Sequence, residues 1–403
     1  MVTASLASIC KRVSSGGTPS RKNADFFSNN ATGHLWVKSK ELLDCAIEDT
    51  EERITDDGLS NSSAKYYPVH TVLIAMYGAN VGQLGWLRKP ATVNQAISGL
   101  VVDEQKADWR YVFYYLLLNR GDLTIQAQGA AQQNLNQDLI RQFSIELPPL
   151  PTQKRIAGIL SAYDELIENS QRRIKILESM ARGLYREWFV HFRFPGHETV
   201  PRISSPLGEI PQGWEVKAIR DFGKVVTGKT PSKANADYFG EEMQFLKTPD
   251  MHGNMFILNT NEHLSSSGAA SQSVKTLPAG SICVSCIGTI GVVSITTEEC
   301  QTNQQINSVV VANRASREFL FLRLQDARQT LENLGSNGAT MGNVNKGKFE
   351  SMEIVCPPTD LLSRYHHFAK PLFLQILALA RQTQNPRRTR DLLLPRLLSG
   401  QIN

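Results

Sequence analysis

The chain carries one long sequence pattern twice. Residues 17–27 contain Thr-Pro-Ser followed by Asn-Ala-Asp and two aromatic residues, and residues 229–239 repeat this order. Further along, Asn94-Gln95 and Asn303-Gln304 lie 209 positions apart. Solenoid repeats are only about 20–50 residues long, whereas each copy here is large enough to be a domain. The duplication therefore predicts two related domains with a pseudo-twofold organisation, which contact a target in two places.

The composition is that of a soluble protein with two or three domains. Of the 403 residues, 41% are hydrophobic, an ordinary share for a globular chain. Residues 112–118 form the longest notable apolar run, which is too short to cross a bilayer. Residues 1–12 lack the layout of a secretion signal, so we expect a cytoplasmic location without membrane contact. A net charge of +5 permits nucleic-acid binding through local patches without requiring it.

Two of the six cysteines, Cys283 and Cys286, have the spacing C-x-x-C. Such a pair can supply half of a zinc site or a redox centre. No second C-x-x-C or H-x-x-x-H follows to complete a zinc site. In the repeat register the two cysteines correspond to Ile74 and Tyr77, inside an apolar, strand-like run. We therefore predict buried, reduced thiols and no metal site.

The order of short segments is the same in both halves. Strands are expected at residues 71–77 and 281–287, because each apolar run leads into glycines. Helices are expected at residues 108–120 and 316–328, beginning with an aspartate and a serine that can cap the first turn. Each half is therefore predicted to be a small mixed α/β domain.

A heptad seam follows the first domain. Its apolar residues alternate spacings of three and four, as the seam of a coiled coil does. A helix packed on an ordinary core remains the alternative. As one helix the stretch would span about 50 Å at 1.5 Å per residue. The seam positions are Ile156, Leu160, Tyr163, Ile167, Ser170, Ile174, Leu177, Ala181, Leu184 and Trp188.

The last part of the chain continues this pattern less regularly. Leu372, Ile376 and Leu379 fit a seam, whereas the next three seam positions are polar or proline. Asn385-Pro386 predicts a helix break followed by a second helix, and Pro395 predicts a kink. We expect this region to pack antiparallel against the first helix as a two-helix coiled coil.

These observations divide the chain into four parts with an α+β fold. Residues 1–150 and 201–358 are predicted to be the two duplicated domains. Residues 151–200 form a central long helix, and residues 359–403 form a C-terminal helical region. The long antiparallel helix pair would separate the two domains.

Residues 223–230 match the phosphate-binding pattern G-x-x-x-x-G-K-[ST]. Pro231 follows at once, where a phosphate-binding helix needs backbone N–H donors. The other copy lacks both the first glycine and the lysine. A turn beside a binding surface is therefore the favoured interpretation, and nucleotide binding is the alternative.

No catalytic motif is present in the sequence. The Pro-Pro pairs lack the amide or acid and the aromatic residue that an amino-methyltransferase loop needs. Pro249-Asp250 is not followed by the Asp/Glu-x-Lys of a metal-dependent nuclease. The eight histidines are scattered, without metal-ligand spacing. The chain is therefore predicted not to be an enzyme on its own.

Amide, hydroxyl and lysine side chains recur at matched places in the two copies. Asn and Gln can bond base edges, while Lys, Ser and Thr hold phosphates. Any single one of them can equally be an ordinary loop residue. The arginines near the C-terminus are either phosphate contacts or part of a solvated helix face; they are Arg381, Arg387, Arg388 and Arg390. The candidate DNA-binding residues are Thr18, Ser20, Lys38, Lys40, Asn80, Asn94, Gln95, Gln132, Gln133, Asn134, Lys229, Thr230, Ser232, Lys247, Thr248, Asn303, Gln304, Asn343, Asn345 and Lys346.

Several of these segments together resemble the specificity subunit of type I restriction-modification systems. Besides the duplicated Thr-Pro-Ser turns and Asn-Gln pairs, they include the glycine-bounded residues 78–82 and 288–291. The stretch 147–157, which leads into the seam, carries the most specific match. Residues 184–192 and 389–400 complete the pattern, which covers essentially the whole chain.

The resemblance implies two target-recognition domains that each read half of a bipartite site in double-stranded DNA. The helices would be a spacer and the docking site for two methyltransferase subunits, which restriction-translocase subunits join. Adenine methylation and ATP-driven cleavage, with S-adenosylmethionine, ATP and Mg, would then belong to those partners and no cofactor to this chain. A coiled-coil adaptor without DNA binding is a further alternative. The half-sites and the spacer length do not follow from the sequence.

Overall fold

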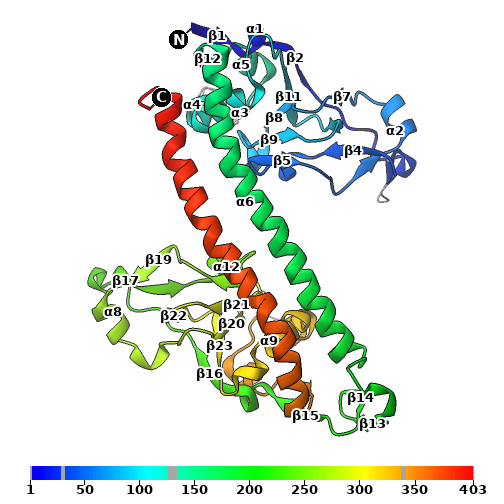
Figure 1. The fold of residues 1–403 in the computed structure, drawn as a ribbon, viewed down its shortest axis with the longest axis vertical. Coiled ribbons are helices and arrows are strands. Elements are labelled where there is room, and N and C mark those ends of the chain that lie inside the picture. Colours follow the sequence, from blue (N-terminus) through cyan, green and yellow to red (C-terminus); the bar gives the residue numbers. More distant parts are fainter. Residues whose placement is uncertain (1, 29–31, 126–133, 337–341, 403) are drawn as a thin grey trace. The chain divides into compact units, whose positions relative to one another are not determined.

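A computed structural model of the chain describes residues 2–28, 32–125, 134–336 and 342–402. The chain divides into two compact units (Figure 1). Unit 1 comprises Met1–Ile167 and Asn385–Asn403, and unit 2 comprises Glu168–Gln384. Each unit therefore contains one copy of the repeat together with parts of both long helices.

The described part of unit 1 contains two five-stranded sheets and a two-stranded one. Its strands are β1 (Val2–Ser5), β2 (Cys10–Ser15), β3 (Phe27–Ser28), β4 (His34–Val37), β5 (Cys45–Ile47), β6 (Arg53–Ile54), β7 (Tyr66–Tyr67), β8 (Val72–Ala75), β9 (Leu84–Leu87), β10 (Ala91–Val93), β11 (Ile97–Val102) and β12 (Ser144–Leu147). The larger sheets have the orders β2-β11-β8-β9-β5 and β3-β6-β4-β10-β7, while β1 pairs with β12. All four residues of β8 are buried, which confirms the first predicted strand.

Unit 2 repeats this arrangement around its own strands. They are β13 (Arg202–Ser205), β14 (Gly208–Pro211), β15 (Glu215–Ala218), β16 (Gly223–Thr227), β17 (Phe239–Leu246), β18 (Phe256–Ile257), β19 (Glu262–Leu264), β20 (Ile282–Ser285), β21 (Val293–Thr296), β22 (Cys300–Thr302), β23 (Ile306–Val311) and β24 (Glu353–Cys356). One sheet has the order β16-β23-β20-β21-β18, and the second has the order β19-β17-β22. Two further sheets of unit 2 are two-stranded, one formed by β15 with β24 and the other by β13 with β14.

The two sheets that carry the repeat have equivalent topology. In both, the first strand of the order pairs antiparallel with the second, and the last strand pairs parallel with its neighbour. The second sheets share a parallel pair, β4 with β10 in unit 1 and β17 with β22 in unit 2. The duplication predicted from the sequence is therefore a duplication of the fold.

Short helices cover the sheets and are similarly repeated. They are α1 (Leu6–Ile9), α2 (Asp56–Ser60), α3 (Trp109–Leu118), α4 (Arg120–Ile125), α5 (Gln137–Gln142), α7 (Thr248–Met251), α8 (Ser266–Ala270), α9 (Arg317–Asp326), α10 (Arg328–Gly335) and α11 (Lys346–Glu350). Asp108 caps α3 as predicted, because its carboxylate accepts from the backbone N–H groups of Arg110 and Tyr111. The predicted cap at Ser316 is wrong, since its hydroxyl donates to the carbonyl of Asn313 instead.

Two long helices supply residues to both units. The first, α6 (Leu150–Tyr185), continues into a π-helical turn at Arg186–Val190. It thus ends short of residue 200, the bound that the sequence predicted for the central long helix. The second, α12 (Thr359–Leu398), is continuous.

The predicted helix break at Asn385-Pro386 is therefore wrong, whereas the kink at Pro395 stays a prediction. Proline removes one backbone hydrogen bond but leaves the remaining ones intact. The polar residues at the following seam positions also have partners in the folded chain. The hydroxyl of buried Thr383 donates to the carbonyl of Leu379 at 2.6 Å. Arg390 forms an ion pair, described next.

In unit 1 the beginning of α6 packs against the end of α12. Ile156 and Leu160 share a buried core with Leu394, Leu397 and Leu398. A polar contact joins the same two helices to α3. Arg390 Nη1 lies 2.6 Å from Asp164 Oδ1, and the Tyr114 hydroxyl donates to Asp164 Oδ2 at 2.5 Å. The two helix segments of this unit therefore run antiparallel, as predicted.

In unit 2 the end of α6 packs against the beginning of α12. The ring centroids of Trp188 and Tyr365 are 5.7 Å apart, and Ala181, Phe373 and Ile376 belong to the same buried core. Other predicted seam residues are only half-buried, so the seam is less completely buried than its periodicity suggests. Half-buried members are Tyr163, Ile174, Leu177, Leu184 and Leu372.

Substitution of Ile167 tests the seam against a neighbouring control. Ile167 is 7% exposed and Leu166 is 57% exposed. We expect Ile167→Asp to lower the free energy of unfolding by about 3–5 kcal/mol, because it places an unpaired carboxylate in a buried position. Leu166→Asp should change it little. Thermal unfolding of both variants measures the difference, and equal melting temperatures would contradict the seam.

Candidate nucleic-acid interface

In both copies the Thr-Pro-Ser turn meets the Asn-Gln loop, two motifs far apart in the sequence. The hydroxyl of Thr18 donates to Gln95 Oε1, and the hydroxyl of Thr230 donates to Gln304 Oε1 at 2.7 Å. Both glutamines are exposed. In each unit, the structure thus brings together two candidate DNA-binding residues that the sequence analysis identified separately.

Backbone contacts hold each turn against the strand that precedes the loop. The N–H of Gly17 donates to the carbonyl of Val93, and the N–H of Lys229 donates to the carbonyl of Thr302. The approach is close enough to require glycine, because a Cβ on Gly228 would lie 2.1 Å from the carbonyl oxygen of Asn303. We call each of these turns, together with its glutamine, a platform. The platform of unit 1 consists of residues 17–20 and Gln95, and that of unit 2 consists of residues 229–232 and Gln304. The close backbone contacts make each platform rigid.

This geometry does not favour the nucleotide-binding alternative. Gly223–Thr227 is strand β16, and the N–H groups of Gly228 and Lys229 donate to strand carbonyls. Residues 228–235, all of which the structure describes, contain no helix. A phosphate loop needs free N–H groups at a helix N-terminus, and neither is available here.

The asparagines of the two loops stabilise the loops themselves. Asn94 Oδ1 accepts from the N–H of Ala96, and Asn303 Oδ1 accepts from the N–H of Gln305. Asn303 is also only 7% exposed. In each Asn-Gln pair the glutamine is the more exposed residue, because Asn94 is half-buried and Asn303 is buried.

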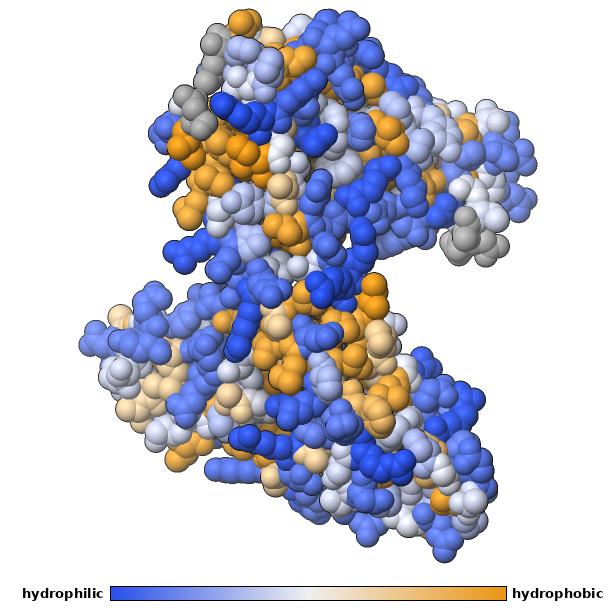
Figure 2. Space-filling view, viewed as in Figure 1, coloured by the Kyte–Doolittle hydropathy of each residue, from blue (hydrophilic) through white to orange (hydrophobic). Residues whose placement is uncertain are grey.

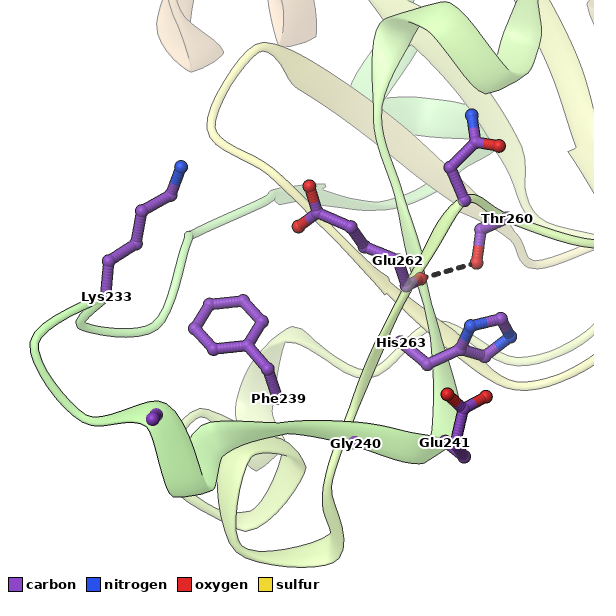
Figure 3. A pocket seen from close by; sticks show the side chains of 9 residues that line it. Lys233, Phe239, Gly240, Glu241, Thr260, Glu262 and His263 are labelled. Carbon is purple, nitrogen blue, oxygen red and sulfur yellow. Dashed lines mark hydrogen bonds between the residues drawn. The ribbon is translucent and has the colours of Figure 1, made fainter.

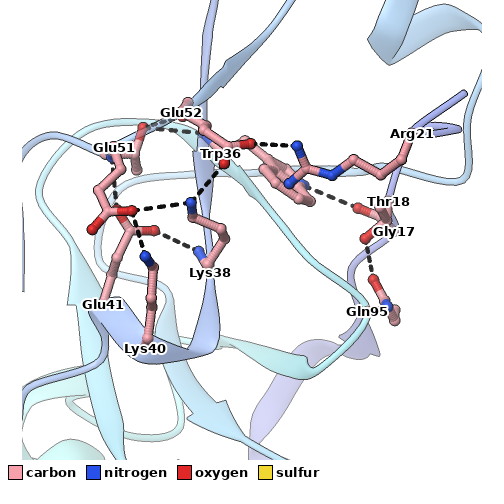
Figure 4. Close-up of polar contacts among 11 residues, drawn as sticks. Gly17, Thr18, Arg21, Trp36, Lys38, Lys40, Glu41, Glu51, Glu52 and Gln95 are labelled. Carbon is pink, nitrogen blue, oxygen red and sulfur yellow. Dashed lines mark hydrogen bonds and ion pairs between the residues drawn. The ribbon is translucent and has the colours of Figure 1, made fainter. Parts of the chain in front are cut away.

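Lys38 and Lys247 lie in equivalent clamps with carboxylates, of which Figure 4 shows the clamp of Lys38. Lys38 Nζ is 2.8 Å from Glu52 Oε1, and Lys247 Nζ pairs with Glu262 Oε1. Burial lowers the pKa of Lys38, but its bonds to Glu52 and Glu51 outweigh burial and raise it. The pKa of Glu52 is lowered, chiefly by the hydrogen bond from Lys38. The charge of Lys38 is thus already neutralised within the domain.

The remaining candidates vary in exposure. Thr248 is buried, Asn345 caps α11 by accepting from Lys348 N–H, and Lys40 pairs with Glu51. Lys346 lies 3.6 Å from Glu350. Gln132 and Gln133 lie outside the described residues. Asn80 and Asn134 are half-buried, whereas Ser20, Lys229, Ser232 and Asn343 are exposed.

Sequence reasoning missed the cations directly after each turn. Arg21 and Lys22 in unit 1, and Lys233 in unit 2, are exposed beside the exposed serines. Among the described residues, neither Lys22 nor Lys233 has a hydrogen-bonding or ion-pair partner. These cations could have been found from the sequence, because they come immediately after a duplicated Thr-Pro-Ser. This position places a positive charge beside the platform.

A hollow of about 670 Å³ lies beside the unit 2 platform (Figure 3). Lys233 lies across it from the ring of Phe239 and the carboxylate of Glu262. Asn261 and His263 also line it. The site combines an aromatic face, a carboxylate and an unpaired ammonium group.

The structure supports the predicted burial of the cysteine pair. Cys283 and Cys286 are free thiols and are 0% and 1% exposed. Burial raises the pKa of Cys283 to about 12 and that of Cys286 to about 11. Among the described residues, no group of three or more His, Cys, Asp or Glu side chains is suited to a metal ion.

Comparison with known proteins identifies the family. Residues 2–179 and 211–361 match the family described as type I restriction modification DNA specificity domain. The chain is 31% identical over 353 residues to the HindI specificity subunit of Haemophilus influenzae, covering 72% of this chain and 77% of that protein. The chain belongs to this family of specificity subunits, which are not the catalytic components of the complexes. The resemblance seen in the sequence is therefore confirmed.

Two more distant relatives extend the match. The MjaIX specificity subunit of Methanocaldococcus jannaschii is 23% identical over 404 residues, with 97% of this chain and 91% of that protein covered. The crystal structure of a type I restriction-modification S subunit from M. genitalium has a TM-score of 0.62 at 13% identity. It covers 98% of this chain and 95% of its own. That structure supports the duplicated fold.

The clamp on Lys38 makes stability depend on pH. The lowered pKa of Glu52 means that its contribution is complete above about pH 4.3, the ordinary glutamate value, and disappears as the pH falls through the lowered value. We expect Lys38→Met to lower the melting temperature by about 2–4 °C at pH 7, with the deficit shrinking in acid.

Lys40→Met is the matched control, because the Lys40 side chain is 57% exposed while that of Lys38 is 15% exposed. Lys40→Met should melt like the unsubstituted protein at every pH. Thermal unfolding from pH 3 to 7 makes the comparison. A deficit for Lys38→Met that does not depend on pH would contradict the clamp.

Proposed function

We propose that this protein is the DNA-recognition subunit of a type I restriction-modification complex. Each copy of the duplicated domain reads one half of a bipartite site in double-stranded DNA. The observation that carries the proposal is the doubled platform, in which exposed Gln95 and Gln304 each receive a threonine hydroxyl. Glutamine can bond base edges, and the exposed lysines beside it suit phosphates.

The two copies differ where base contacts would lie. Lys229 occupies the position of Gly17, and the cations after the turns differ as well. One scaffold that carries different exposed side chains suits two half-sites of different sequence. The arginines Arg381, Arg387 and Arg388 of α12 are exposed and remain candidates for phosphate contacts. Arg390 is not one of them, because it binds Asp164.

The helical regions 151–200 and 359–403 serve as the spacer and as the docking site for two methyltransferase subunits. Apolar side chains remain exposed on the helices of unit 2, and Figure 2 shows hydrophobic residues gathered over this part of α12. Ile176 and Met180 of α6, and Phe368 and Leu374 of α12, are each at least half exposed. Such a surface suits a protein partner.

The chemistry belongs to the partners. S-adenosylmethionine serves the methyltransferase subunits, while ATP and Mg serve the restriction subunits that complete the complex. The complex acts in the cytoplasm on cellular and incoming phage DNA. Within the described residues, no helix has the length and apolar character that a membrane span needs.

Methylome sequencing of the source cell, with and without this gene, is the direct test. We expect deletion to remove one bipartite adenine-methylation motif. An unchanged methylome would contradict the proposal. The coiled-coil adaptor alternative predicts assembly with partners but no salt-sensitive DNA binding, because phosphate contacts weaken as salt rises.

The duplication provides a matched pair of variants. We expect Gln95→Ala to relax specificity in one half of the motif and Gln304→Ala to relax it in the other, at a cost of about 1–3 kcal/mol in discrimination. Both side chains are exposed, so the fold should persist. Binding to duplexes randomised in one half at a time distinguishes them. Effects of either variant on both halves would contradict separate reading.

A further inference from the structure

Three side chains around the unit 2 hollow have equivalents in unit 1. Arg21 and Lys233 each follow Thr-Pro-Ser, and Phe27 and Phe239 each end the Asn-Ala-Asp segment. The glutamates Glu52 and Glu262 match by structure. The carbonyl oxygens of Glu52 and Glu262 each accept from a threonine hydroxyl two residues earlier, at 2.7 Å in both copies. The two sites can therefore be compared atom by atom.

In unit 1 the site is filled by the chain itself. The guanidinium carbon of Arg21 lies 4.2 Å from the ring centroid of Phe27 and 5.0 Å from that of Trp36. Arg21 Nη1 is 2.8 Å from Glu52 Oε2, while Lys38 holds the other oxygen (Figure 4). A flat group with N–H donors thus covers the aromatic ring and reaches the carboxylate.

In unit 2 the same receiving groups are present without that occupant. Lys247 holds Glu262 Oε1, as Lys38 holds Glu52 Oε1. Among the described residues, none donates to Glu262 Oε2, and Lys233 lies on the opposite side of the hollow (Figure 3). Lysine is a compact point charge and lacks the planar fork with which arginine spans a ring and a carboxylate.

We infer that this hollow reads the amino-bearing edge of a cytosine or adenine in the half-site of unit 2. The base amino group donates to Glu262 Oε2, the edge of the base lies against the Phe239 ring, and Lys233 contacts a neighbouring phosphate. A carboxylate accepting from a cytosine amino group is an established form of base readout. The inference rests on the proposed function and names a specificity-determining residue, Glu262, for it. Unit 1 has no open hollow of this kind, because the Arg21 side chain occupies the equivalent site.

The decisive variant is Lys233→Arg, which reproduces the unit 1 arrangement and closes the hollow. Lys233 is exposed, so the fold should be kept, and Lys233→Ala is the control that leaves the hollow open. The probes are duplexes bearing the motif found by methylome sequencing. In each probe, one adenine is replaced by purine or one cytosine by pyrimidin-2-one, so that a single amino group is lost. Binding is measured with the complete methyltransferase complex.

We expect one position in one half-site at which losing the amino group weakens wild-type binding about tenfold. Lys233→Arg should bind the natural duplex about tenfold more weakly and be insensitive to the replacement there. Lys233→Ala should keep the sensitivity. Glu262→Met should also lose it, because methionine offers no oxygen acceptor, and this result supports the assignment independently of Lys233.

Two results would overturn the inference. One is a Lys233→Arg complex that discriminates the amino-lacking duplexes as the wild type does. The other is a Lys233→Arg chain that binds DNA normally but fails to assemble with the methyltransferase, which would indicate a partner protein's arginine as the occupant. Failure of the proposed function is distinct, because the wild-type complex would then bind no motif specifically at all.

Discussion

Both units depend on apolar packing between a recognition domain and helices from distant parts of the chain. In unit 1, Leu160 shares a core with Leu397, and in unit 2, Trp188 packs against Tyr365. Hydrophobic burial has no direction of its own, so the arrangement is specified by which surfaces are apolar. The N-terminal domain therefore completes its core only when the last helical turns of the chain are present.

Within that frame, the duplicated domains separate structural roles from recognition roles. The lysine–glutamate clamps and the asparagine turns are the same in both copies, and they occupy the lysine ammonium groups and the asparagine oxygens that build them. The exposed positions after the Thr-Pro-Ser turns differ between copies. Change is thus concentrated at side chains whose replacement leaves the scaffold intact.

The duplication could be predicted because its motifs recur in the same order along the chain, and the buried strands and the apolar seam could be predicted because local periodicity determines them. The continuity of α12 through Pro386 could not, since partners far along the chain stabilise the helix on both sides. Lys38 and Asn303 were predicted to contact DNA because the sequence does not show which groups they bind within the folded domain. Their true partners, Glu52 and the Gln305 N–H, become visible only once the loops are folded. The Arg21–Phe27 contact likewise depends on tertiary structure.

The contact of Asp164 with Arg390 and Tyr114 has a consequence for helix register. An apolar seam tolerates sliding by whole heptads at modest cost, because one leucine replaces another. Sliding α12 past α6 would leave the half-buried Asp164 carboxylate without its cation, and the Tyr114 hydroxyl from α3 would then stand alone against it. One charged pair among apolar neighbours thus selects a single alignment of the helices.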